Sequence, residues 1–419
     1  MSRFSTPTGT QDILPQDWPF WSFVMRQAEA AATLRGYRRI ETPIFAETTL
    51  FARTSGEGSD LVHKEMYSFK DRDGSDLTLR PEGTAPVMRA YLQHGMQRLP
   101  QPVKLYYFER MYRRERPQKG RYREHRQFGC EALGSEDPLI DAEMIALLAD
   151  FYGRVGIRDV DLHLNSIGDG DCRPAYIRDL TSFLEDRVEQ LAPLDRDRLG
   201  RNPLRILDSK EPQTRQVISD APHILEYLCD SCRAHWNTLR GALDALHIPY
   251  TVDPLLVRGL DYYTRTTFEF IPAGGGSQST IGAGGRYDAL SESIGGPSVP
   301  GVGFGSGIER IIEEIRSRGV PVPATSSTQV YVAWVGSGTE LPAMALAEQL
   351  RKHDIPTEVA LGSLSLKTQL KRADATGARC AVIVGEDELA RGEAMVRDLS
   401  TGEQRTRPIE TIPESLKEA

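Results

Sequence analysis

The sequence predicts an α+β chain in two parts, a larger region of β-hairpins and helices followed by a small α/β domain. A chain of 419 residues is long for one domain, so two or three are expected. Apolar runs at Leu105–Tyr112 and Phe128–Leu133 flank a loop that contains Pro117 and Gly120, which is the pattern of a β-hairpin. After residue 328, strand-like and helix-like segments alternate, which is typical of an α/β domain with largely parallel strands.

The composition is that of an ordinary soluble globular protein, with 39% hydrophobic and 26% charged residues. No apolar run approaches the roughly 18 residues that cross a bilayer. The N-terminal segment lacks the hydrophobic core of a signal peptide, so we expect no membrane contact and a cytoplasmic location. The formal net charge of −8 argues against nonspecific nucleic-acid binding by the whole surface, although it permits one basic face.

The elements before the hairpin follow from apolar periodicity and turn residues. Asp17 caps and Gly36 ends a helix whose apolar residues have helical spacing. Next we expect a strand interrupted at Pro43, two short strands around a glycine turn, and a helix, at Tyr37–Phe45, Met66–Phe69, Leu77–Leu79 and Ala85–Gln93.

Beyond the hairpin, a helix at Pro138–Val155 and a strand at Val160–Ser166 lead into a mainly helical insertion at about residues 170–250. Strand character resumes at Thr266–Ile271 and Ser279–Gly282. A linker at residues 321–328 separates residues 1–320 from a domain of residues 329–419. In that domain we expect three strands and two helices, at Gln329–Val335, Leu341–His353, Thr357–Ala360, Leu364–Thr376 and Cys380–Val384.

The loop of the hairpin is strongly basic. Residues 110–126 contain eight arginines or lysines and two glutamates, a formal charge of +6. Such charge repels itself unless an anion lies against it, and the planar guanidinium of arginine grips phosphate oxygens in pairs. A solvated basic loop is the usual explanation of surface charge, but here the charge density and the flanking strands favour a polyphosphate or nucleic-acid site.

Four further segments carry candidate ligand-binding residues. Residues 256–265 place Arg258, Tyr262 and Tyr263 in a turn before a strand, where they serve either a polar ligand or a buried structural network. Glycines in residues 282–288 permit a close backbone approach or a tight turn. Alternate glycines in residues 301–310 leave one strand face without side chains before Arg310. This segment does not open a βαβ unit, which excludes a dinucleotide fingerprint. Glu82 and Thr84 are either ligands or a helix cap.

The five cysteines are few and scattered. Cys229 and Cys232 form a single CxxC, whereas a zinc site normally needs a second ligand pair. Because the surrounding residues read as an amphipathic helix, we expect two helical cysteines, no metal held by the protein's own side chains and no prosthetic group.

Six segments are specific in combination: GTQDILP (9–15), RPEGTAP (80–86), ERPQKGRYR (115–123), LVRGLDYYTR (256–265), GAGGRYDAL (282–290) and GFGSGIER (303–310). In these segments, and in their order, the chain resembles the histidyl-tRNA synthetases, which are class II aminoacyl-tRNA synthetases. RGLDYY and GGRYD match the two histidine-specific signatures of that family. The resemblance implies a catalytic domain on a mixed, mostly antiparallel sheet, a C-terminal anticodon-binding domain, and a homodimer with an interface around Pro43.

The resemblance also implies a reaction. ATP, with Mg²⁺, would activate L-histidine to histidyl-adenylate with release of pyrophosphate, and the histidyl group would pass to the 3′ end of tRNA(His) with release of AMP. Arg113 would hold the α-phosphate and the histidine carboxylate, and Arg258 would stabilise the charge that develops at the α-phosphate. Arg121 and Arg310 would bind the outer phosphates. The ATP site would also include Glu115 and His125, and the histidine site would comprise Glu82, Gly83, Thr84, Arg113, Gln127, Glu131, Arg258, Tyr262 and Tyr263.

One position departs from the family pattern. Before Gln127 the family usually has phenylalanine followed by histidine, and this chain has His125 and Arg126. The phenylalanine is expected to stack on adenine. A histidine ring also stacks but buries less apolar area, so the departure predicts weaker ATP binding.

Binding of tRNA is expected from residues 329–419, whose formal charge is −3. Contacts there must therefore come from local groups, and Lys367, Lys371 and Arg372 on one predicted helix are the candidates.

Two other functions stay open from the sequence. The first is a histidine-sensing regulatory subunit of ATP phosphoribosyltransferase, which would lack the C-terminal domain and the arginine at position 258. The second is a ligase that activates histidine but acylates an acceptor other than tRNA.

Overall fold

The structure is a computed structural model, and it describes residues 4–56, 62, 65–115, 121–260, 262–274, 279–323 and 328–417. The chain divides into two compact units, Met1–Val322 and Pro323–Ala419. The predicted turn at Pro117 and Gly120 lies outside the described residues, as does Asp261.

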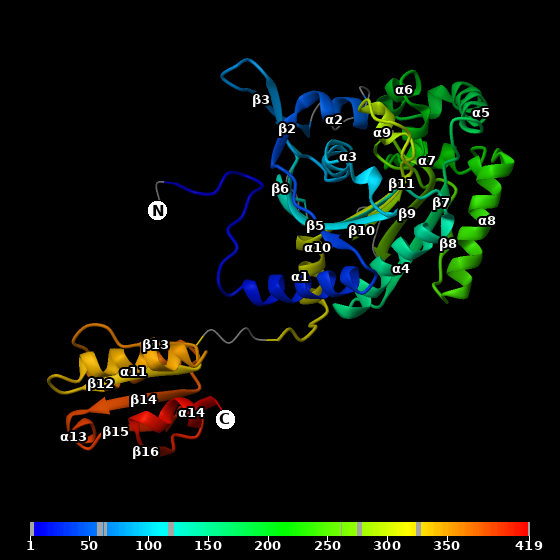
Figure 1. The fold of residues 1–419 in the computed structure, drawn as a ribbon. Coiled ribbons are helices and arrows are strands. Elements are labelled where there is room, and N and C mark those ends of the chain that lie inside the picture. The colour runs from blue at the N-terminus through cyan, green and yellow to red at the C-terminus, as the bar shows by residue number, and fades with distance from the viewer. Residues whose placement is uncertain are drawn as a thin grey trace. The chain divides into compact units, whose positions relative to one another are not determined.

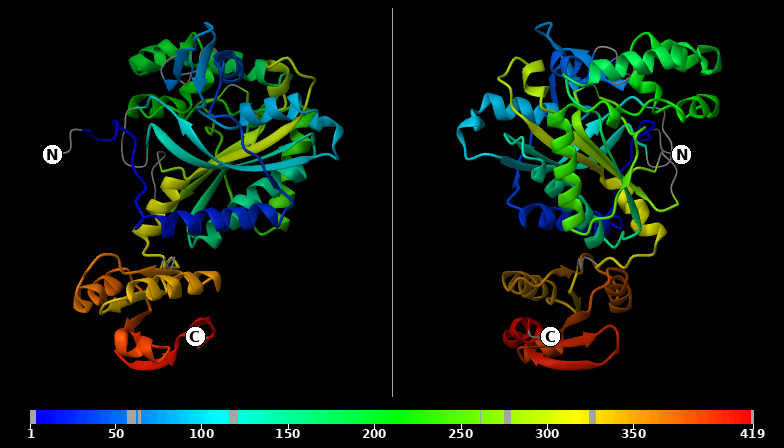
Figure 2. Two further views of the ribbon diagram at one scale, coloured as in Figure 1. Left: turned by 60° about the vertical axis from the view of Figure 1, so that its left-hand side comes forward. Right: turned by 90° about the vertical axis from the view of Figure 1, so that its right-hand side faces the viewer.

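A sheet of eight described strands forms the centre of the first unit, in the order β1-β5-β6-β11-β10-β9-β7-β8 (Figure 1). Only β1 with β5 and β7 with β8 pair in parallel, so the sheet is mixed and mostly antiparallel. Figure 2 shows the twist of its strands from two further sides. The strands are β1 (Arg38–Arg39), β5 (Val103–Tyr112), β6 (Glu124–Leu133), β7 (Val160–Ser166), β8 (Thr251–Val252), β9 (Thr264–Pro272), β10 (Gly282–Arg286) and β11 (Gly301–Gly307).

The predicted hairpin is confirmed as β5 and β6, which pair antiparallel from Val103 with Leu133 to Tyr112 with Glu124. Successive side chains of a strand point to opposite faces of the sheet. Phe128, Cys130 and Ala132 therefore enter the core on one face, while Gln127 and Glu131 point to the other.

Helices cover the two faces of the sheet unequally (Figure 1). One face packs against α1 (Trp18–Thr33), α4 (Pro138–Arg154), α8 (Asp230–Ala245) and α10 (Ile308–Ser317), which together form the largest apolar core. The opposite face carries α3 (Thr84–Gln93) and α9 (Leu290–Ser293), whose smaller core includes Tyr107, Tyr262, Tyr263 and Tyr287. The second face is the one that carries the polar residues described below.

The remaining elements of the first unit lie in two groups. A small sheet has the order β2-β4-β3, from β2 (Phe45–Glu47), β3 (Tyr67–Lys70) and β4 (Asp76–Leu79), next to α2 (Thr48–Ser55). Residues between β7 and β8 form the helical insertion, with α5 (Arg173–Glu185), α6 (Pro193–Leu199), α7 (Pro212–Ile218) and α8. The insertion has its own apolar cluster, which includes Tyr176, Leu180 and Leu207.

Several predictions from local sequence are wrong. Asp17 precedes α1 but its side chain makes no capping hydrogen bond, and only Arg38–Arg39 and Phe45 of the strand expected at Tyr37–Phe45 are in strands. The strand expected at Ser279–Gly282 is instead β10, which begins at Gly282 and runs through GAGGR. Glycine weakens a strand by itself, and here pairing with β9 and β11 on both sides stabilises it. The helix expected across Cys229 is also wrong, because α8 begins at Asp230 and Cys229 is its N-cap residue. The two cysteines thus lie at a helix start rather than within a helix.

The second unit has a five-stranded sheet of order β13-β12-β14-β15-β16 among its described residues. Strands β12 (Val330–Val335), β13 (Thr357–Val359) and β14 (Cys380–Gly385) are parallel, as predicted, and β15 (Glu393–Asp398) and β16 (Gln404–Pro408) add an antiparallel edge. Helices α11 (Glu340–Lys352) and α14 (Ile412–Lys417) cover one face and α12 (Leu366–Ala375) covers the other. α13 (Glu386–Ala390) follows β14. No described helix in either unit has the length and apolar character needed to cross a membrane.

Candidate active site

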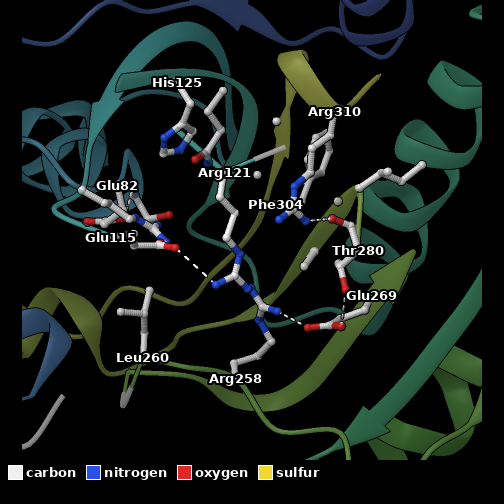
Figure 3. Close-up of a pocket in the computed structure, with 18 of the residues that line it drawn as sticks. Glu82, Glu115, Arg121, His125, Arg258, Leu260, Glu269, Thr280, Phe304 and Arg310 are labelled. Atoms are coloured by element: carbon white, nitrogen blue, oxygen red, sulfur yellow. Dashed lines mark hydrogen bonds and ion pairs between the residues drawn. The ribbon is translucent and has the colours of Figure 1, made fainter. Parts of the chain in front are cut away.

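A polar cavity of about 350 Å³ opens on the α3 face of the large sheet, and 18 of its lining residues are drawn in Figure 3. It is bounded by the return strand β6, the start of α3, the segment before β9, and the glycine strands β10 and β11. Six of the residues expected to bind ATP line it, namely Arg113, Glu115, Arg121, His125, Arg258 and Arg310. Seven of the nine residues expected to bind histidine line it, namely Arg113 and Arg258 again together with Glu82, Thr84, Gln127, Tyr262 and Tyr263.

Arginines converge on the cavity from three separate segments (Figure 3). Arg121 pairs with Glu115 at 3.3 Å, and Arg258 forms an ion pair with Glu269 on β9. Arg310, at the start of α10, donates to the backbone carbonyl of Thr280. Each guanidinium is therefore held in place by the protein, and the combined positive charge favours an anion in the cavity.

Arg113 is fixed through the backbone of the RPEGT turn. Its Nε donates to the carbonyl of Pro81 at 2.8 Å, and its Nη1 lies 3.8 Å from Glu115. The turn itself is anchored by Arg80, which is buried and pairs with Glu109 at 2.8 Å. This arrangement places Arg113 beside Glu82 at the junction of the cationic and carboxylate parts of the cavity.

Glu82 begins α3. Its two carboxylate oxygens accept from the backbone N–H groups of Thr84 and Ala85, at 2.7 and 2.9 Å. The sequence left open whether Glu82 was a cap or a ligand. The geometry permits both, because the carboxylate that accepts from the first backbone N–H groups of α3 also lines the cavity. Burial raises the pKa of the Glu82 carboxyl, while these backbone donors and Arg113 lower it.

Glu131 lies behind the cavity rather than in its lining. Its side chain is fully buried, and it accepts hydrogen bonds from Thr84 at 2.9 Å, from Tyr107 at 3.1 Å and from Tyr287. Burial raises the pKa of Glu131 to about 8, against the opposing effect of these hydroxyl donors. Gly83, also expected in the histidine site, is likewise absent from the lining. A Cβ at Gly83 would collide with the ring of Tyr107, so this glycine makes room for the tyrosine that holds Glu131.

Side chains from β6 occupy the space above two of the alternate glycines of β11. A Cβ at Gly303 would collide with the Glu131 carboxylate, and one at Gly305 would collide with the Gln127 amide. A Cβ at Gly307 would meet nothing within 4 Å. The absence of side chains at Gly303 and Gly305 therefore makes room for Glu131 and Gln127 of β6. Gly303, Gly305 and Gly307 also form part of the cavity wall.

His125 and Arg126 point to opposite faces of β6. His125 lines the cavity, and burial, with Arg113 and Arg310 adding to it, lowers the pKa of its imidazole to about 3. The ring is therefore neutral at physiological pH and presents an aromatic surface without added charge. The guanidinium of Arg126 lies 5.0 Å from the ring of Trp21 and 5.6 Å from that of Trp18, a cation–π contact on the α1 side.

Sequence reasoning missed several residues that line the cavity, among them Glu269, Thr280 and Glu309. Glu269 pairs with Arg258, and Thr280 donates to the Glu269 carboxylate at 2.9 Å. Glu309 accepts from the backbone N–H of Arg126 at 2.8 Å, and burial raises the pKa of its carboxyl to about 7. Glu309 precedes Arg310 within GFGSGIER, which was the only available signal. Glu269 and Thr280 carried none, because these contacts join residues of separate segments.

Arg286 of the GGRYD segment does not belong to the cavity. It is fully buried and pairs with Asp141 of α4 and, at 3.1 Å, with Asp288. Asp141 also accepts from Thr266 at 2.6 Å and lies 2.9 Å from His235 of α8. This network joins β10 to the helices beneath the sheet, so Arg286 acts on the cavity only through the fold.

A family model described as histidyl-tRNA synthetase matches residues 9–311, and a second, described as an anticodon binding domain, matches residues 329–419. The chain belongs to the histidyl-tRNA synthetase family. It is 47% identical over 409 residues to the histidine–tRNA ligase of Dehalococcoides mccartyi, with 98% of each chain covered. It is also 47% identical to that of Moorella thermoacetica, with 97% of this chain and 96% of the relative covered.

Among solved structures, the apo histidyl-tRNA synthetase of S. aureus superposes with a TM-score of 0.83 at 36% identity, covering 99% of this chain and 100% of the other. The likeness thus extends over both units. It confirms the predicted fold class, a synthetase-like α+β domain with a helical insertion and a separate α/β domain.

Proposed function

We propose that the protein activates L-histidine with ATP and transfers the histidyl group to the 3′ end of tRNA(His). The observation that carries the proposal is one cavity in which arginines from three segments face Glu82, Thr84, Gln127 and the tyrosine pair, in a chain of this family. Anionic and amino-acid groups are therefore expected side by side in it.

In the first step, an oxygen of the histidine carboxylate attacks the α-phosphorus of ATP, and the bond to the bridging oxygen of pyrophosphate breaks. Arg113 would hold the carboxylate and the α-phosphate together. Arg258, held by Glu269, would stabilise the negative charge that builds up at the α-phosphate, while Arg121 and Arg310 bind the departing phosphates. Arginine stays charged and cannot serve as a base, so the site acts by positioning and electrostatic stabilisation.

Recognition of histidine rests on the carboxylate and tyrosine side of the cavity. Glu82 and Tyr263 would bond the imidazole, and Gln127 and Thr84 would surround the α-amino group. Glu131 would orient Thr84, because it accepts a hydrogen bond from the Thr84 hydroxyl at 2.9 Å. Buried polar groups that match a substrate reject analogues that leave them unpaired, which provides specificity without editing.

Mg²⁺ would reach the cavity as the Mg²⁺ complex of ATP, and it would offset phosphate charge there. Hard cations take oxygen ligands. Glu309 fits such an ion, because its Oε2 is buried and has no hydrogen-bond partner among the described residues, and because its carboxylate lines the cavity.

In the second step, a hydroxyl of the terminal ribose of tRNA attacks the carbonyl carbon of the adenylate, and AMP departs.

Residues 1–320 would carry both steps, residues 321–328 would form a linker, and residues 329–419 would bind the anticodon. On α12, Lys367, Lys371 and Arg372 are all exposed, which supports their assignment to tRNA.

The protein would act as a homodimer in the cytoplasm, where tRNA is charged. Ile44 and Phe45 near Pro43 are 41% and 46% exposed, and Phe69 of the same small sheet is 45% exposed with its ring 6.4 Å from that of Phe45. Exposed apolar side chains grouped in this way favour an interface.

Pyrophosphate exchange with each amino acid, followed by charging of total tRNA, tests the proposal. Histidine-dependent exchange and charging of tRNA(His) are expected. Absence of exchange would contradict the enzyme function, and exchange without charging would favour a different acceptor. The regulatory-subunit alternative is not favoured, since the relatives are named as ligases and a family model matches the second unit.

A further inference from the structure

A cluster of one carboxylate and three thiols lies outside the cavity. Asp169, Cys172, Cys229 and Cys232 each offer one ligand atom, and these atoms all lie within 4.8 Å of one another. The Sγ atoms of Cys172 and Cys232 are 3.8 Å apart. An Asp169 carboxylate oxygen lies 3.4 Å from Cys172 Sγ and 3.9 Å from Cys229 Sγ.

These separations fit a tetrahedral metal centre. With zinc–sulfur bonds of about 2.3 Å and zinc–oxygen bonds of about 2.0 Å, two thiolates lie roughly 3.8 Å apart and a thiolate and a carboxylate oxygen roughly 3.5 Å apart. The sulfur–sulfur separation of 3.8 Å equals the first value, and the oxygen–sulfur separations of 3.4 and 3.9 Å bracket the second. A disulfide would require sulfur atoms about 2.05 Å apart.

The second ligand pair that the CxxC lacked is a DxxC. Asp169 and Cys172 are three residues apart, as are Cys229 and Cys232. The first pair lies between β7 and α5 and the second lies at the start of α8, so each pair is next to the start of a helix. The backbone is shaped for this approach. Gly168 has a φ of +62°, and a Cβ there would lie 2.5 Å from Cys172 Sγ. The amide of Asp169 donates to Cys172 Sγ at 3.3 Å, as amides do around metal-bound thiolates.

An arginine beside the cluster offsets part of the negative charge that a metal-bound cluster would carry. Three thiolates and one carboxylate would leave a bound divalent ion with an excess negative charge. Arg265 lies against the cluster, with its Nη2 3.5 Å from Asp169 and 3.2 Å from the hydroxyl of Ser231. Its φ of +49° shows that the chain accepts an unfavourable backbone conformation at this arginine.

We propose that Asp169, Cys172, Cys229 and Cys232 bind one Zn²⁺ as a closed structural site. Soft thiolate ligands in tetrahedral arrangement select zinc over Mg²⁺ or Ca²⁺. The ion would tie the start of α5 to the start of α8, and so close the insertion segment of residues 173–228 against the end of β7. Closing such a loop stabilises the folded state.

The site also adjoins the proposed histidine pocket. Arg173, next to Cys172, donates to the backbone carbonyl of Tyr263 at 2.7 Å and to that of Gly168 at 3.1 Å. Zinc would therefore hold the segment that carries Tyr262 and Tyr263. The metal assignment itself does not depend on the proposed function.

The full-length protein, purified under reducing conditions, should contain about one zinc per chain by mass spectrometry of the metal. After removal of zinc with a chelator, addition of Co²⁺ should produce the visible bands of a tetrahedral ion and a thiolate-to-cobalt charge-transfer band. Cys172→Ser and Cys232→Ser should lose both signals. Cys380→Ser, in the second unit, is the matched control and should keep them.

Thermal unfolding of the wild-type chain provides a readout that needs no variant. Removal of zinc should lower the Tm by several degrees, and zinc but not Mg²⁺ should restore it. Absence of zinc together with no cobalt spectrum would overturn the proposal. So would full metal content in Cys172→Ser, or a Cys172–Cys232 disulfide in the protein purified without reductant and free of metal.

Discussion

Arg258 and Glu269 form an ion pair at the wall of the cavity, and Thr280 donates to the other oxygen of the same carboxylate at 2.9 Å. The Nε of Arg258 is buried and has no hydrogen-bond partner in the described part of the chain. The guanidinium is thus oriented before any substrate arrives and still has a donor to offer. Such preorganisation is what electrostatic stabilisation of a transition state requires.

Replacement of Arg258 separates catalysis from binding. Arg258→Ala should lower histidine-dependent pyrophosphate exchange by about 10²–10³-fold or more. The affinity for histidine, measured by calorimetry, should change only a few-fold, because Glu82, Thr84 and Gln127 stay in place. Loss of both properties together would show that Arg258 is structural.

The surroundings of two glycines in β11 predict different effects on stability for the same substitution by alanine. Gly303→Ala places a methyl group on the Glu131 carboxylate, which is fixed by three hydroxyls, and should destabilise the protein by about 1–3 kcal/mol in urea unfolding. Gly307→Ala meets nothing within 4 Å and should leave stability nearly unchanged. Equal stability of the two variants would contradict the close packing of β6 against β11.

His125 predicts an effect on ATP binding and on acid stability. The folded-state pKa of about 3 lies below the ordinary value of 6.5, so only the unfolded chain binds this proton between those pH values. The stability from a neutral His125 is therefore fully present above pH 6.5 and is lost as pH falls toward 3. His125→Phe should remove this dependence in urea titrations and should lower the KM for ATP. An unchanged KM would argue against stacking on adenine.

The pH dependence of stability that arises from Glu131 has the opposite sign to that from His125. Its folded-state pKa of about 8 exceeds the ordinary value of 4.5, so the folded chain retains a proton that the unfolded chain loses between those values. The unfavourable burial of this carboxyl therefore grows as pH rises from 4.5 to 8. The stability of Glu131→Gln relative to wild type should therefore be higher at pH 8 than at pH 5. The same substitution should raise the KM for histidine. If the difference in stability is the same at both pH values, the carboxyl is ionised in the folded protein.

The anticodon assignment is tested on α12. Replacement of Lys371 and Arg372 together by alanine should raise the KM for tRNA about tenfold, because charge contacts to phosphates dominate such affinity. Pyrophosphate exchange should stay unchanged. Lys352→Ala, an exposed lysine at the end of α11, is the control. An unchanged KM for tRNA would contradict the assignment.

Much of the fold followed from local patterns. The hairpin β5–β6, helix α4 and strand β7 lie within two residues of their predicted bounds at nearly every end, because each combines strong periodicity with clear turn residues. β10 could not be predicted, because its five residues include three glycines and pairing with neighbouring strands alone makes it a strand. The antiparallel edge of the second unit was missed as well, because β15 and β16 are short and polar.

By itself the sequence determined the arginine-rich hairpin, the tyrosine pair and the six segments that mark the family. Local composition and segment order carry that information. Only the tertiary structure decided that Glu269 holds Arg258, that Glu131 lies behind the cavity, and that Asp169 and Cys172 meet Cys229 and Cys232. These contacts join residues from separate elements, and their proximity depends on which strands pair and which helices pack, a property of the whole chain rather than of any local segment.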